Sequence, residues 1–220
     1  MTIQSATRRE FIRNAIMTTA ALPLLVGCQS RVTVEAASSD ILELLKKNAK
    51  PKGTEGMGAI DVPENVSWTT TLSNEKDKGE SMEISGMVYQ PDGKTIAPNT
   101  LIYLYHTDFE GYYGRGSSEH KHGRYRGWML TDKEGRYLLR SIKAAPYPEN
   151  RFAAHIHMSV TGLKQKEDWI DSILFEGDRL ISARERETAG ARGGFQPIVT
   201  LAKGKDGILR ATRDIRLMTA

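Results

Sequence analysis

The chain has 220 residues and a formal net charge of +4, from 31 basic and 27 acidic side chains. Three arginines and one glutamate lie in residues 1–27, so the rest of the chain carries a net charge of only +2. A chain so close to neutral lacks the basic surface that nucleic acids require, and we expect no nucleic-acid partner. Its length supports one sizeable hydrophobic core and is short for two.

Residues 1–27 have the pattern of an export signal. Arg8 and Arg9 precede an apolar run over residues 15–26, which is too short for a comfortable membrane span. The paired arginines resemble a twin-arginine signal, and Leu-Val-Gly-Cys at the end of the run resembles the lipobox of bacterial lipoproteins. We therefore expect a protein of the bacterial periplasm or cell surface, lipid-anchored to a membrane through Cys28. The alternative is a plain secretory signal with an incidental cysteine.

Cys28 is the only cysteine of the chain, so no intramolecular disulfide can form. Residues 28–65 are polar and mixed, and we expect them to tether the following domain. Within them, apolar residues at helical spacing follow Ser-Ser-Asp, which predicts a short helix over residues 40–49.

Residues 66–220 have the pattern of one all-β domain. Apolar runs and alternations predict strands near residues 82–88, 101–105, 128–130, 137–139, 155–160, 170–175, 197–201 and 208–217. Short strands at this spacing predict an antiparallel sandwich or a barrel. Residues 111–127 are glycine-rich and show little periodicity, which indicates a long loop of the kind that carries function in compact domains.

Two histidines occupy alternate positions in one of these strands. His155 and His157 are flanked by Ile156, Met158 and Val160, and alternate residues of a strand project from the same face. Neutral imidazole is a common ligand for zinc, copper and iron, so one metal ion could contact both rings. On its own, this spacing fits a pair of surface histidines equally well.

Five blocks of sequence, taken in order, resemble the intradiol ring-cleavage dioxygenases, which are non-haem iron(III) enzymes that open catechols between the two hydroxyl groups. The blocks are Asp108–Tyr113, Gly127–Tyr137, Arg140–Pro148, Ala154–Val160 and Leu174–Asp178. The resemblance covers about residues 80–181. It implies an all-β, antiparallel β-sandwich with a long glycine-rich active-site loop.

The same resemblance implies a set of iron ligands, namely Tyr113, Tyr147, His155 and His157. Tyr113 is preferred to Tyr112 because the first ligand of the family follows the loop glycine by two residues. The set suits the ion, since iron(III) prefers anionic oxygen, and a phenol with a reference pKa of about 10 loses its proton on such an ion. Two phenolates and one hydroxide balance the three positive charges. Because phenolates stabilise the oxidised metal, the iron need not be reduced and no external electron donor is needed.

The resemblance also implies that the substrate displaces Tyr147 and leaves Tyr113 bound, which gives Tyr147 a catalytic role. Well-studied members of the family carry an arginine three residues before the first ligand histidine. This chain has Phe152 at that position, and Arg151, one residue earlier, is the candidate catalytic arginine.

Two further positions near the substrate differ from the family pattern. A frequent glutamine is Ser172 here, and a frequent aromatic residue is Glu149. We predict that Glu149, Phe152 and Ser172 line the substrate pocket. A carboxylate at Glu149 would repel benzoate-type substrates, so we expect an uncharged catechol or a larger plant phenolic rather than protocatechuate.

The sequence therefore predicts a dioxygenase that cleaves a catechol or another ortho-diphenol with O₂ to give a cis,cis-muconate-type diacid. The alternative is a non-catalytic lipoprotein that binds iron or a catecholate, which the altered arginine and glutamine positions favour. His120 and His122 are interpreted as solvated loop residues, with a place in the lining of the pocket as the less favoured alternative, and His106 is given no role. The oligomeric state, including a homo-oligomer, stays open.

Overall fold

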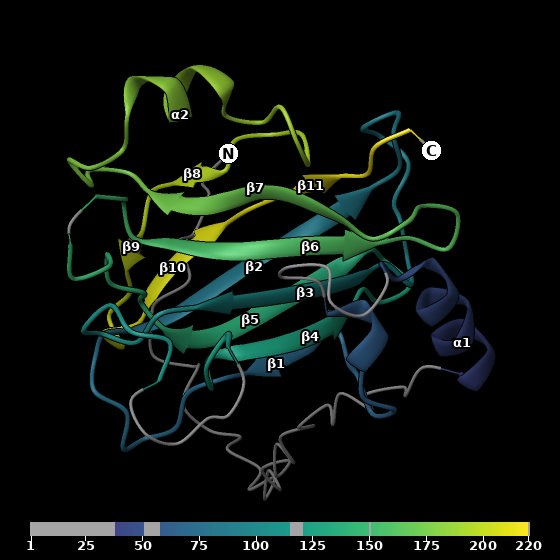
Figure 1. The fold of residues 1–220 in the computed structure, drawn as a ribbon, viewed down its shortest axis with the longest axis horizontal. Coiled ribbons are helices and arrows are strands. Elements are labelled where there is room, and N and C mark those ends of the chain that lie inside the picture. The colour runs from purple at the N-terminus through teal and green to yellow at the C-terminus, as the bar shows by residue number, and fades with distance from the viewer. Residues whose placement is uncertain (1–37, 51–57, 115–120, 150, 220) are drawn as a thin grey trace, which may run out of the picture. The chain divides into compact units, whose positions relative to one another are not determined.

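The computed structural model describes residues 38–50, 58–114, 121–149 and 151–219. The predicted signal, Cys28 and His120 lie outside these residues. The described part contains two β-sheets that face one another, with helix α2 (Ala183–Thr188) beyond the strand β7 and helix α1 (Ser39–Asn48) at the other end of the sheets (Figure 1). No helix among the described residues has the length and apolar character needed to cross a membrane.

The first sheet has six strands, in the order β1-β5-β2-β10-β9 with β11 also paired to β2. These strands are β1 (Thr69–Thr71), β2 (Ser81–Tyr89), β5 (Arg136–Ile142), β9 (Ala202–Lys203), β10 (Leu209–Thr212) and β11 (Ile215–Arg216). Asp206 and Gly207 lie in the turn between β9 and β10, which pair antiparallel.

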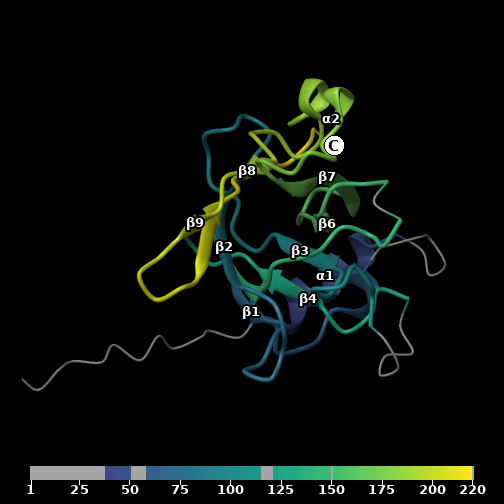
Figure 2. The ribbon, with the colours of Figure 1, turned by 90° about the vertical axis from the view of Figure 1, so that its left-hand side faces the viewer.

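The second sheet has five strands, in the order β4-β3-β6-β7-β8. They are β3 (Leu101–His106), β4 (Arg126–Leu130), β6 (His155–Thr161), β7 (Asp168–Phe175) and β8 (Ile198–Val199). The view in Figure 2 shows β2 and β9 in one layer and β3, β6 and β7 in the other. The predicted sandwich is confirmed.

The pairing within the sandwich is mixed rather than purely antiparallel. The long central pairs, such as β2 with β5 and β3 with β6, are antiparallel as expected. The short strands β1 and β8 join β5 and β7 in parallel, and β10 and β11 both join β2 in parallel. These strands reach their partners through long connections, which allow parallel pairing, whereas a tight hairpin turn does not.

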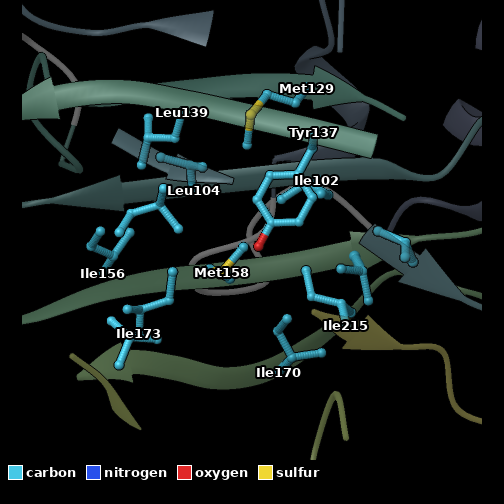
Figure 3. Packing of buried hydrophobic residues seen from close by; sticks show 14 of the residues in the cluster. Ile102, Leu104, Met129, Tyr137, Leu139, Ile156, Met158, Ile170, Ile173 and Ile215 are labelled. Atoms are coloured by element: carbon cyan, nitrogen blue, oxygen red, sulfur yellow. The ribbon is translucent and has the colours of Figure 1, made fainter. Parts of the chain in front are cut away.

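The main core lies between the two sheets. Strand β6 contributes Ile156, Met158 and Val160, all at most 1% exposed, and β5 contributes Tyr137 and Leu139 (Figure 3). Burying one such aliphatic side chain stabilises the fold by about 1.5–3 kcal/mol. Because side chains alternate along a strand, the histidines of β6 are left on the opposite, outer face of the second sheet.

A second, smaller core lies on that outer face, under α1. Leu42 and Leu45 of the helix pack with Ala59 of the short helix η1 (Ala59–Asp61) and with Leu101 and Leu130 of the sheet. The predicted helix is therefore present, but the expectation that residues 28–65 form only a tether is wrong for this part. An amphipathic helix with two buried leucines gains more from docking on an apolar sheet end than from solvent exposure.

Candidate metal centre

The outer face of β6 carries both histidines side by side. His157 pairs across the sheet with Tyr105 of β3. On the other side, the register of β6 with β7 shifts, since Ile156 pairs with Ile173 but Met158 pairs with Ile170. Two residues of β7, Asp171 and Ser172, therefore oppose His157 alone, which is a β-bulge. Bulges re-aim side chains, and this one directs both residues toward the same site.

The two tyrosines come from loops that are held against each other. The backbone N–H of Ala145 donates to the carbonyl of Asp108 at 3.2 Å, and the Asp108 carboxylate accepts from the N–H of Tyr112 at 3.0 Å. Gly111 adopts a positive φ of 88°, and a Cβ there would lie 2.0 Å from the carbonyl oxygen of Pro146. Only glycine allows this approach, which sets the Tyr113 loop against the Tyr147 loop.

The structure brings the four side chains of the predicted ligand set to one point. The Nε2 atoms of His155 and His157 are 2.9 Å apart, and the Tyr147 hydroxyl lies 3.3 Å and 3.4 Å from them. The Tyr113 hydroxyl lies 3.1 Å from the Nε2 atom of His157 and contacts the Tyr147 hydroxyl. Donor atoms about 2 Å from one shared ion lie roughly 3 Å from one another, so the set has the spacing of a coordination site.

Hydrogen bonding and burial favour ligand-competent histidines. The Nδ1–H of His155 donates to the carbonyl of Ala153 at 2.6 Å, which leaves the lone pair of Nε2 directed at the other donors. Burial lowers the pKa of His157 to about 3, helped by the nearby His155 and His122, so this imidazole is neutral near pH 7.

The chemistry of the donor set fits iron(III). Burial and the hydrogen bond with Tyr147 raise the pKa of Tyr113, so its phenol is protonated until a highly charged cation replaces that proton. No group of three or more His, Cys, Asp or Glu side chains in the described ranges has the arrangement of a metal site. The tyrosines are thus what completes this one, and phenol oxygen is a donor that suits a hard, oxidised ion.

A stack of rings supports His157 from behind. The His122 ring lies 3.8 Å from the Tyr105 ring and parallel to it within 3°, and Tyr105 stacks on His157 at 4.5 Å. The Nδ1 atom of His122 is 2.6 Å from the Tyr103 hydroxyl. The expectation that His122 is solvated is wrong, because this imidazole covers aromatic side chains on the outer sheet face and is itself only 5% exposed.

His106, which received no role, is fully buried. Its Nδ1–H donates to the carbonyl of Thr107 at 2.6 Å, and its Nε2 accepts from the hydroxyl of Ser141 at 2.8 Å. Burial lowers the pKa of His106 to about 4. The residue is a structural link between β3 and β5, and the periodicity of the sequence gives no sign of it.

Two cavities adjoin the four donors, and both are lined by Tyr147 and His157. The first, called here the α2 cavity, has a volume of about 350 Å³ and is also lined by Phe152, His155, Asp171, Ser172, Leu174, Glu185, Thr188, Ala189 and Pro197. The second, of about 470 Å³, is also lined by Tyr105, Tyr113, Lys121, His122 and Trp169.

Phe152 and Ser172 thus lie where the sequence places them, beside the donors. Glu149 and Arg151 are exposed and are not among the described residues that line either cavity. Glu149 lies in a turn, and its predicted effect on the substrate has no geometric support. The catalytic role of Arg151 stays a prediction. Asp171 and Glu185 were missed, because neither the bulge nor α2 leaves a periodic signal in the sequence.

Comparisons with known proteins agree with this fold. A family model described as "Dioxygenase" matches residues 61–203. The protocatechuate 3,4-dioxygenase beta chain of Burkholderia cepacia is 26% identical over 140 residues, which cover 59% of this chain and 58% of that relative. The match thus spans well under two thirds of the relative's length.

Solved structures show the same fold at lower identity. The dioxygenase domain of a dioxygenase–carbohydrate-binding protein fusion from Streptomyces sp. SirexAA-E has a TM-score of 0.53 at 20% identity, over 69% of this chain and 88% of that one. Chlorocatechol 1,2-dioxygenase from Pseudomonas putida has a TM-score of 0.53 at 21% identity, over 77% of this chain and 70% of that one. The chain belongs to the intradiol ring-cleavage dioxygenase family. That family is generally dependent on Fe³⁺.

Proposed function

We propose that this chain is a non-haem iron(III) dioxygenase that opens the ring of an ortho-diphenol between its two hydroxyl groups. The carbon–carbon bond between the hydroxylated carbons breaks, each carbon gains one oxygen atom of O₂, and the product is a cis,cis-muconate-type diacid. The observation that supports this most directly is the meeting of the donor atoms of Tyr113, Tyr147, His155 and His157. These four residues would hold the iron.

Bound iron(III) would keep both catechol oxygens ionised and make the ring reactive toward O₂. The chain's own part is to receive one of the two catechol protons and to make room, while the hydroxide that would balance the charge of the iron takes the other. Tyr147 lines both cavities, and its phenolate oxygen is placed to accept one of the two catechol protons as the side chain moves aside. Pro146 and Pro148 restrict the backbone on each side of Tyr147 and leave its side-chain torsions free. Tyr113 and the two histidines stay in place.

The α2 cavity is the better candidate for the substrate ring. Phe152, Leu174 and Pro197 give it apolar walls, and it reaches both histidines. The described residues that line it include no lysine or arginine, so nothing there would pair with a carboxylate on the ring. This supports an uncharged catechol over protocatechuate. The reason is the absence of a cationic partner among these residues, rather than repulsion by Glu149. Faster turnover of protocatechuate than of catechol would contradict the preference.

The function is tested by loading purified protein with iron(III) anaerobically, recording its visible spectrum, and then adding catechol and O₂. Tyrosinate-to-iron charge transfer should colour the protein, and O₂ uptake should match the formation of the ring-opened diacid. Colourless protein after loading would exclude the site. Coloured protein that consumes no O₂ with any ortho-diphenol would identify the chain as a non-catalytic binder of iron or catecholates.

We also propose that the enzyme is exported and anchored by a lipid on Cys28, as the twin-arginine and lipobox patterns indicate. Metabolic labelling with a fatty-acid analogue should mark the full chain and should not mark Cys28→Ser. Labelling of both to the same extent would contradict the anchor.

A further inference from the structure

The α2 cavity is lined by two acidic residues that come from different elements. The β7 bulge turns Asp171 and Ser172 toward His157 together, so Asp171 lines the cavity beside the candidate metal ligands. Glu185 lines it from the first turn of α2. A strand without the bulge would direct only one of the two neighbouring residues to this face.

Backbone and hydroxyl donors hold both carboxylates in place. Asp171 accepts from the N–H groups of Gly190 and Arg192 through one oxygen, at 2.9 Å and 3.1 Å. Glu185 forms a capping box with Ser182, accepting from its N–H at 2.7 Å and its hydroxyl at 2.6 Å. In each case the hydrogen bonds described reach one carboxylate oxygen, and all of their donors are neutral.

Two other carboxylates near these elements behave differently, because arginines pair with them. Glu176 binds Arg186 in a two-point contact at 2.9 Å, and Asp168 binds Arg192 at 2.7 Å. Asp171 and Glu185 form no salt bridge with any residue in the described ranges. Arg213 influences Asp171 electrostatically, but its guanidinium is fully buried and donates to the carbonyls of Gly194 and Asp214.

We propose that Asp171 and Glu185 make the α2 cavity select an ortho-diphenol whose ring carries an alkylammonium substituent. The inference rests on the proposed ring-cleaving function and specifies its substrate class. An ammonium group on a short alkyl arm would gain two negative partners, while the ring would keep its contacts with Phe152 and Leu174. A carboxylate on the same arm would be repelled, and an uncharged arm would be neither favoured nor rejected.

Three catechols of similar size separate charge from shape, namely 4-ethylcatechol, 4-(2-aminoethyl)catechol and 3,4-dihydroxyphenylacetate. We expect the iron-loaded enzyme to show a kcat/KM roughly five- to tenfold higher for the ammonium compound than for the ethyl compound, and lowest for the carboxylate. Anaerobic calorimetric titration should give the same order of Kd values, independently of turnover.

Two conservative variants test the residues directly. Glu185→Gln preserves the capping box and Asp171→Asn preserves an acceptor oxygen, so each removes charge with little change in shape. Each should reduce the ratio of kcat/KM for the ammonium compound to kcat/KM for 4-ethylcatechol about threefold or more. Glu187→Gln is the matched control, because Glu187 lies on the same helix, is exposed, and does not line the cavity.

Equal kcat/KM and Kd values for the ammonium and ethyl compounds in the unmodified enzyme would overturn the inference. An equal loss of preference in Glu187→Gln would also overturn it, because the effect would then come from net charge alone. Failure of the proposed function gives a different result. In that case none of the catechols is cleaved, while the order of the calorimetric Kd values still supports or contradicts the charge preference.

Discussion

The hydroxyl groups of Tyr113 and Tyr147 contact each other although 34 positions separate the residues along the chain. Each lies on its own loop, and the glycine at position 111 lets the two loops approach closely. The identity of the first tyrosine ligand is therefore a matter of loop register. Tyr112, one residue earlier, forms no part of the group of four donors described above.

Tyr113→Phe should abolish both the colour and the activity of the iron-loaded enzyme. Phenylalanine keeps the ring contacts with Tyr105 and Tyr147 but removes the oxygen that would bind the metal. Visible absorption after iron loading and O₂ uptake with catechol would measure the effect. Tyr112→Phe is the control and should keep both properties; if it loses them and Tyr113→Phe does not, the register is wrong by one residue.

Gly123→Ala should displace the backbone of Tyr113. Gly123 has a φ of 65°, and a Cβ at this position would lie 1.5 Å from the backbone oxygen of Tyr113. The loop would have to move, so we expect a loss of iron-dependent colour and a decrease of about 3 kcal/mol in the free energy of unfolding.

Gly207→Ala is the matched control for backbone strain alone. Its φ is 81°, but a Cβ there has no atom within 4 Å. We expect the free energy of unfolding, measured with urea, to decrease by about 1–2 kcal/mol and the visible spectrum to stay unchanged. Equal effects of the two substitutions on the spectrum would show that the contact between Gly123 and Tyr113 is unimportant.

His106 should make the stability of the protein depend on pH. Its pKa is about 4 in the folded chain, below the ordinary 6.5, because the buried ring is costly to protonate. Between pH 6.5 and pH 4 the unfolded chain takes up a proton that the folded chain does not. The free energy of unfolding should therefore fall by about 3 kcal/mol as the pH drops through this window, with no effect of this group above it.

His106→Gln removes the titrating ring and keeps a donor and an acceptor for Thr107 and Ser141. Urea unfolding at pH 7 and pH 4 should show a smaller loss of stability in the variant than in the unmodified protein. The carboxylates titrate in both proteins, so their contributions to the loss of stability cancel in this comparison. Identical losses in the two proteins would mean that His106 is not the source.

The docking of α1 can be tested with two neighbouring leucines. Leu45 is completely buried, whereas Leu44 is 41% exposed. Leu45→Ala should lower the free energy of unfolding by about 2–4 kcal/mol, since it leaves a cavity under the helix. Leu44→Ala should cost under about 1 kcal/mol. Similar small effects of both would indicate that the helix is not part of the cooperative fold.

The sequence is sufficient to predict the sandwich and the group of four donors. Alternation in β6 places His155 and His157 on one face, and the ordered blocks supply the two tyrosines at the correct positions. The strands and the paired histidines depend on local periodicity, which is present in the sequence before any tertiary contact is known. The two tyrosines rest instead on the resemblance of the ordered blocks to the dioxygenase family.

What the sequence does not predict depends on contacts between distant segments. The β7 bulge exists only because of its pairing with β6, so Asp171 could not be recognised beside Ser172. The burial of His122 depends on Tyr103 and Tyr105 of another element. The exposure of Glu149 depends on the conformation of its loop. The parallel pairing of the short strands also depends on contacts between distant segments, so the sequence does not predict it.

Strand β6 has one further consequence, for the order in which the protein is assembled. Ile156 and Met158 face the main core, and the histidines between them face outward. The contacts that stabilise the folded chain are thus physically separate from the atoms that would bind iron. We expect the scaffold to fold without waiting for metal, and loss of a ligand to produce a stable, empty protein rather than an unfolded one. Supply of iron, rather than folding, would then determine how much active enzyme a cell contains.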